Sequence, residues 1–206
     1  MASILSVEQL KGLSSGDTPN TITLPTGQTL DFSAGTLTMP AGHILQVVST
    51  ALDGAPAGNS TSFVAIDGYS ATITPTSASS KIFIQITGHV GATEDTVAHW
   101  RLKRDKNDGN GFLIPFTNSA NTGAQDGCIW GFYAHTSFDA AFVYQGISQS
   151  FSYLDSPNTT NEITYQIYAR SRDGGTEYWR MNRGDDLSSA GRYTSRSSIT
   201  LMEIAG

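Results

Sequence analysis

The sequence contains very few of the residues from which metal and redox sites are built. Its one cysteine, Cys128, excludes an intrachain disulfide and any zinc site made of several thiolates. The four histidines, His43, His89, His99 and His135, are never two or four positions apart, as paired metal ligands on a strand or helix would be. We therefore expect neither a metal ion nor a cofactor.

Charge is also scarce, and its balance is acidic. Only 15% of the residues are charged, and 12 Lys and Arg oppose 18 Asp and Glu, for a net charge of −6. Domains that bind nucleic acid usually show a basic face. The one basic cluster is Arg101, Lys103, Arg104 and Lys106, and strand alternation would put its first two members on one solvated face. We expect no nucleic-acid partner.

Long apolar runs are missing. No stretch approaches the length needed to span a membrane, so we expect no membrane insertion. The opening stretch "MASILSVEQLKG" has no cationic segment before an apolar run, unlike a secretory signal. These features predict a soluble protein made in a cytoplasm.

The chain does contain 21 Gly and many Thr and Ser, a composition that favours strands and turns. It also repeats a 15-residue pattern, "TITLPTGQTLDFSAG" at 21–35 and "TLTMPAGHILQVVST" at 36–50. Each copy alternates apolar and polar residues and turns at Pro-x-Gly. The matching apolar positions are Ile22, Leu24 and Leu30 in the first copy and Leu37, Met39 and Leu45 in the second.

Two such repeats carry too little apolar surface to form a core alone, so other chains are expected to supply the missing neighbours. The pattern resembles the triple β-spiral of viral fibre shafts, in which three chains wind together. The resemblance implies a short trimeric stalk over residues 19–50, with these six apolar residues at the interface. Two unrelated hairpins are the alternative.

Beyond residue 50 the pattern changes to nine or ten short alternating segments separated by turn signals. "KIFIQITGHVG" places Ile82, Ile84 and Ile86 on one face, and "KNDGNG" and Asp173-Gly174 mark turns. No long helix is indicated. We expect an all-β chain in which residues 51–206 form an antiparallel, jelly-roll-like β-sandwich.

Several segments together carry a family resemblance: "AGHILQVVST", "STSFVAIDGYSATITPTSASSKIFIQITGHV", "WRLKRD", "ITYQIYARSRDGGTEYWRMNRGDD" and "SRSSITLMEIAG". They look like a domain of tail-fibre and other virion-appendage proteins of tailed bacteriophages, especially marine and cyanobacterial phages. The resemblance covers about residues 43 to 206. It implies a virion protein assembled in the host cytoplasm, trimerisation, and often contact with the host surface. The polar segment 1–18 would then dock on another virion protein.

Catalytic motifs are not found. There is no Gly-x-Ser-x-Gly, P-loop or His-Glu-x-x-His. "DKNDGNG" at 105–111 departs from a calcium loop, which requires Gly where Asn110 stands and Glu where Phe116 stands. We predict that the protein is not an enzyme.

The best lead for binding is the long loop at 105–127, because long loops often carry function. Its aromatic and amide side chains could contact a host-surface glycan, namely Phe112, Phe116, Asn118, Asn121 and Gln125. The leading interpretation is a non-enzymatic fibre or appendage. The alternatives are a capsid head fibre or decoration protein and, with less support, a glycan-cleaving tailspike enzyme.

Overall fold

The computed structural model describes residues 26–27, 29, 39–93, 95–105, 112–114, 128–135, 146–183 and 195–206. All regular structure in these residues is β-strand, so the predicted all-β class is confirmed. No helix in this part of the chain could span a membrane. The chain divides into two compact units, Met1–Thr38 and Met39–Gly206, and the strands found in the described residues belong to the second.

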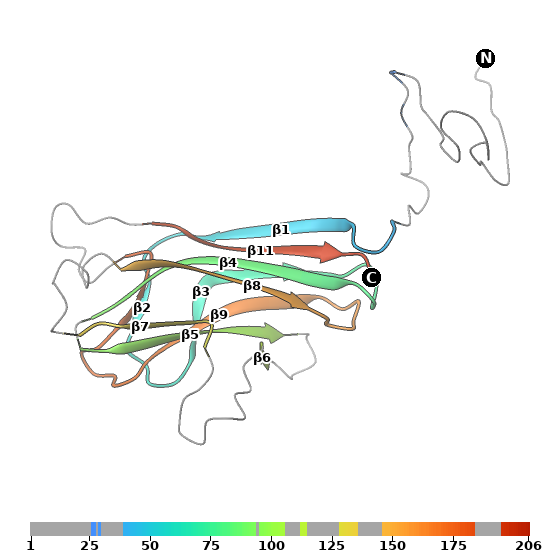
Figure 1. Ribbon diagram of the computed structural model, residues 1–206. Coiled ribbons are helices and arrows are strands. Elements are labelled where there is room, and N and C mark those ends of the chain that lie inside the picture. The colour runs from blue at the N-terminus through green and yellow to red at the C-terminus, as the bar shows by residue number, and fades with distance from the viewer. Residues whose placement is uncertain are drawn as a thin grey trace, which may run out of the picture. The chain divides into compact units, whose positions relative to one another are not determined.

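The second unit is a sandwich of two antiparallel sheets, as predicted (Figure 1). Sheet A centres on β4, which pairs with β8 along one edge and with β11 and then β10 along the other. β1 lies outside β11, and β2 lies outside β10. The strands of sheet A are β1 (Ile44–Leu52), β2 (Ala57–Gly58), β4 (Lys81–Ala92), β8 (Ile147–Asp155), β10 (Trp179–Met181) and β11 (Ser197–Ile204).

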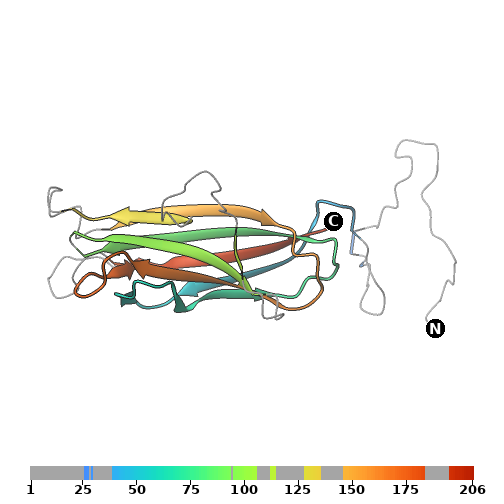
Figure 2. The same cartoon turned by 90° about the horizontal axis from the view of Figure 1, so that it is seen from below.

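Sheet B centres on β5 and β9. β9 pairs with β3 on its outer edge and with β5 on its inner edge, and β5 pairs in turn with β6 and β7. In Figure 2 the strands of both sheets run along the long direction of the sandwich. The strands of sheet B are β3 (Val64–Ile73), β5 (Val97–Asp105), β6 (Phe112–Ile114), β7 (Trp130–Tyr133) and β9 (Ile163–Ser171).

The alternation seen in the sequence decides which face of each strand is buried. Successive side chains of a strand point to opposite faces, so one phase of each alternating segment forms the core. Ile82, Ile84 and Ile86 of β4 are each 0% exposed, as are Trp100 of β5 and Leu201 of β11. The inward-facing side chains of the two sheets therefore form the core of the sandwich.

Close approach of the sheets requires a glycine at position 88. Gly88 lies on the inward side of β4, and a Cβ atom there would overlap the indole ring of Trp130 from β7. Trp130 is only 3% exposed, so its ring has little room to move away. The absence of a side chain at Gly88 is what admits the indole between the sheets.

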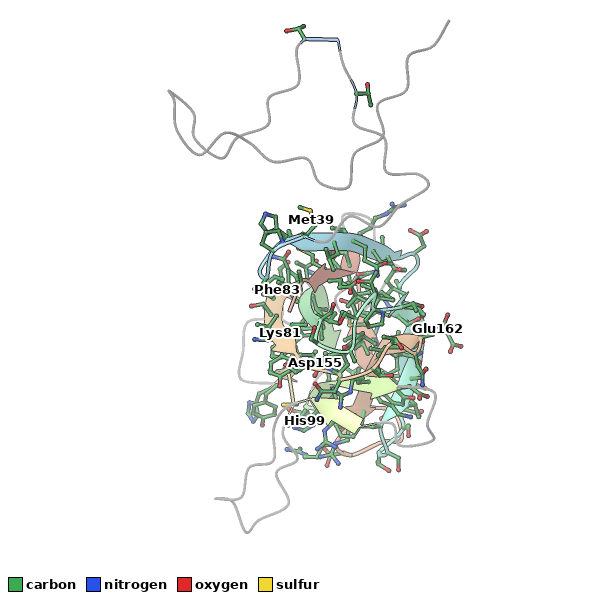
Figure 3. All side chains as sticks on the ribbon, turned by 90° about the vertical axis from the view of Figure 1, so that its right-hand side faces the viewer. Met39, Lys81, Phe83, His99, Asp155 and Glu162 are labelled. Atoms are coloured by element: carbon green, nitrogen blue, oxygen red, sulfur yellow. The ribbon has the colours of Figure 1, made fainter. Side chains whose placement is uncertain are left out.

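A buried ionic group joins the sheets at one end of the sandwich. Asp155 of β8 accepts hydrogen bonds from Arg104 of β5, at 2.6 and 2.8 Å, and from the Tyr165 hydroxyl of β9, at 2.6 Å. Burial, followed by the bond to Asp155, raises the pKa of Tyr165, which therefore stays a neutral donor. Figure 3 shows Asp155 at this end of the molecule. Sheet A thus supplies the carboxylate and sheet B both donors.

A second buried carboxylate, Glu203, anchors β11. It is 0% exposed and accepts hydrogen bonds from the Gln46 amide at 2.6 Å and from the Thr76 backbone N–H at 2.7 Å. Burial raises the pKa of Glu203, but the surrounding donors outweigh it, and the net effect is a pKa below the ordinary value. Glu203 is therefore held as a carboxylate.

The end of the second repeat belongs to the sandwich. Residues 44–52 form β1 and pair with β11, although the sequence assigned residues 19–50 to the stalk. Met39 and Leu45, both half-buried, lie in the same compact unit as the sheets. The physical reason is that the alternating segment finds its partner in β11 of the same chain. The other predicted stalk residues and the docking segment lie outside the described residues: Ile22, Leu24, Leu30, Leu37 and 1–18.

Candidate functional site

An apolar row crosses the outer face of sheet A. The register places Val47 of β1 opposite Met202 of β11, Met202 opposite Phe83 of β4, and Phe83 opposite Leu154 of β8. Directly paired residues of antiparallel strands point to the same face. Val47 is 56% exposed and Leu154 is 46% exposed, so the row reaches solvent at both edges.

The neighbouring row extends this apolar surface toward one end of the sheet. It contains Ile44, which is 55% exposed, then Ile204 and Lys81. Lys81 and Phe83 lie on the same side of the sandwich in Figure 3. We call the six apolar residues of the two rows the contact face: Ile44, Val47, Phe83, Leu154, Met202 and Ile204.

The rest of the outer face of sheet A is rich in hydroxyl groups. Ser49 and Thr200, in the row next to the contact face, are hydrogen-bonded at 2.8 Å, and Thr87 and Ser198 are bonded at 2.9 Å one row further. The apolar residues are therefore gathered at one end instead of being spread over the sheet. A gathered apolar patch on a soluble domain commonly marks an interaction surface.

The chain enters the sandwich at this same end. Gly42 donates a hydrogen bond to the Ala205 carbonyl, and Ala205 donates one to the His43 carbonyl, both at 2.8 Å. The pairing of β1 with β11 is thereby continued back toward Met39. The backbone bonds of Gly42 and His43 with Ala205 therefore lie at the same end of sheet A as the contact face.

The receptor-binding prediction can be followed only at Phe112. It begins β6, where its backbone lies opposite Arg104. Phe116, Asn118, Asn121 and Gln125 lie outside the described residues. The contact face was not predicted from the sequence. A signal for it is present in "KIFIQ" and "ITLMEI", where apolar residues occur on the outward-facing side of the strand as well as on the side that faces the core.

One pair resembles part of a hydrolytic site. His89 Nδ1 lies 3.2 Å from Ser148 Oγ, across the pairing of β4 with β8. A nucleophilic serine needs a base oriented by a third group, together with donors for an oxyanion. The described residues that line the hollow around this pair include Gln149, Ser195 and Arg196 but no carboxylate. Among the described residues, no three metal-ligating side chains are grouped together.

No protein-family model matches the chain, and no curated protein matches its sequence.

Proposed function

We propose that the protein is a non-enzymatic structural protein of a phage virion, a trimeric appendage whose N-terminal segment docks on another virion protein. The sandwich is its head and is available for contact with a host surface. The proposal depends most on one observation, the contact face at the end of the sandwich where Met39 leads into β1.

The strand order supports a jelly-roll head. β5 pairs with β7, β4 with β8, β3 with β9 and β1 with β11, so each pair encloses the one before it along the chain. These four pairs lie alternately in sheet B and sheet A, and the short β2–β10 pair of sheet A is nested between the last two. A long antiparallel hairpin rolled into two sheets has this order, and it is the arrangement of jelly rolls in capsid and lectin domains.

The contact face supports self-association. Its six members are uncharged and Lys81 is the one charged residue of the two rows, so identical copies can meet there with few like charges brought together. A closed ring of three copies brings the same end of each sandwich to one axis, and that end is where the chain passes from Met39 into β1. The occupant we assign to the contact face is therefore a second copy of this chain.

The solution mass tests the trimer. Light scattering of the purified chain at micromolar concentration should give three times the chain mass of 21.9 kDa. A monomer mass would contradict the trimer. Antibody labelling of particles then tests the virion role: label on the tail or baseplate supports an appendage, label on the capsid moves the assignment to a head fibre or decoration protein, and unlabelled particles contradict both.

A further inference from the structure

The outer face of sheet B carries a cluster of cations stacked on aromatic rings. The Arg101 guanidinium carbon lies 4.2 Å from the centre of the Phe63 ring, and that of Arg170 lies 5.0 Å from the same centre. Lys103 Nζ lies 5.4 Å from the centre of the Tyr168 ring. We call these five residues the basic cluster.

Strand register explains why these residues gather. Arg101 and Lys103 are alternate residues of β5 and share its outer face, as the sequence predicted. Tyr168 is paired directly with Arg101, and Arg170 is paired with His99 one row along. Figure 3 places His99 on the opposite side of the sandwich from Met39. Because β5 and β9 belong to sheet B and the contact face lies on sheet A, the basic cluster and the contact face are on different sheets.

Stacking prepares the guanidinium groups for binding. A guanidinium that rests its flat face on an aromatic ring keeps its N–H groups in one plane, and this planar fork matches carboxylate and sulfate oxygens. The Nε atom of Arg170 is buried, so its terminal nitrogens are the ones a ligand would meet. The ring also holds the long side chain in one place, which lowers the entropy lost on binding. The Phe63 ring stacks with both Arg101 and Arg170.

The charge of the cluster contrasts with that of the chain. Three cations lie on neighbouring positions of two strands, in a protein whose net charge is −6. Asp105 is the one acidic residue that follows on the same face of β5. The five residues are half-buried, and they line neither the hollow at Asp53 and Arg196 nor the hollow at His89 and Ser148. An open face of this kind suits a polymer with repeated anionic groups better than a small anion.

We propose that the basic cluster binds an acidic polysaccharide, through carboxylate or sulfate groups held by Arg101, Arg170 and Lys103. The inference rests on the proposed function only in taking the host surface as the source of the polymer. A polysaccharide is favoured over nucleic acid because three cations in an otherwise acidic chain are few for a phosphate backbone.

The test measures retention of the purified full-length chain on immobilised alginate, dextran sulfate and neutral dextran at low salt. We expect binding to at least one anionic matrix and none to neutral dextran, with the binding lost as salt rises. Alginate supplies carboxylates and dextran sulfate supplies sulfates, so the two arms identify the anionic group. Binding to neither, or equal binding to neutral dextran, overturns the proposal.

Matched variants locate the site. The double variant Arg101→Gln with Arg170→Gln should bind at least tenfold more weakly, whereas Arg196→Gln, at an arginine 77% exposed and paired with Asp53, should stay within about twofold. Phe63→Leu keeps every charge and should weaken binding severalfold. Thermal unfolding confirms that each variant is folded.

Two further results would overturn the inference. Equal loss in Arg196→Gln would mean that overall charge governs retention, and equally tight binding to double-stranded DNA would mean general polyanion binding. Particle labelling and solution mass are independent of these measurements. Polysaccharide binding by a protein that is absent from particles would therefore contradict the proposed function and leave this inference standing.

Discussion

Replacing Asp155 by asparagine would show how firmly the two sheets are joined at one end of the sandwich. The substitution keeps the shape of the side chain but removes the charge that Arg104 and Tyr165 both contact. Asparagine can still accept one of these hydrogen bonds through its carbonyl oxygen. The Arg104 guanidinium, in contrast, would lose its counter-charge inside the protein.

The expected loss follows from burial. Removing one partner of a fully buried ion pair costs about 3–5 kcal/mol. The Asp155 side chain is 6% exposed but that of Arg104 is 21% exposed, so water partly compensates the arginine and the loss should fall to about 2–3 kcal/mol. For a domain of this size, that loss corresponds to a decrease in Tm of roughly 4–12 °C.

Urea unfolding at pH 7 measures the loss, and the chain provides a matched control. Asp173 accepts a hydrogen bond of 2.7 Å from Arg172, but these side chains are 42% and 51% exposed. Asp173→Asn should therefore cost only about 0.5 kcal/mol. If the two asparagine variants lose the same stability, burial does not decide the value of the Asp155 pair and the reasoning is wrong.

Three further predictions concern packing, pH and assembly. Gly88→Ala should cost about 1–3 kcal/mol in urea unfolding because its methyl group meets a buried indole, whereas Gly131→Ala, with no atom nearer than 4.0 Å, should change stability by less than about 0.5 kcal/mol. Because the pKa of Glu203 is lowered from 4.5, its carboxylate stabilises the fold fully at pH values above 4.5, and this contribution is lost as the pH falls through the folded-state pKa. A Glu203→Gln variant should lack that part of the acid sensitivity. A pH profile of stability identical to that of the unmodified chain would refute the assignment. Val47→Asp should convert the trimer to a monomer in light scattering while Ala51→Asp, two rows away on the same strand face, should not; trimers in both variants would contradict the contact face.

The layout of the sandwich could be predicted because alternation is a local signal. Ile82, Ile84 and Ile86 already identify the buried face of β4, and Arg101 and Lys103 identify the outer face of β5. Each inference needs only the two-residue period of a strand. The end of the predicted stalk was placed too late in the chain for a related reason. The alternation of β1 can be read in the sequence, but its pairing with β11 of the same chain cannot.

Features that depend on register could not be predicted in this way. Val47 and Leu154 join one apolar row only because β11 and β4 lie between their strands in one alignment, and a shift of one residue would turn each side chain to the other face. Arg104 and Asp155 are 51 positions apart and belong to different sheets. Pairings of this kind are decided by the tertiary fold as a whole.

The nested strand order also means that the first strand to be synthesised pairs with the last one. β1 is the first strand to be made, yet its partner β11 is the last of the described strands, and the hydrogen-bonded residues Ser49 and Thr200 are 151 positions apart. Until β11 is available to fill the place between β1 and β4, β1 presents unpaired backbone groups and the exposed side chain of Val47. Such long-range pairings close slowly. The newly made chain therefore passes through a stage in which its earliest strand is open to pairing with a neighbouring chain, and its yield should depend on the temperature and the chain concentration during synthesis.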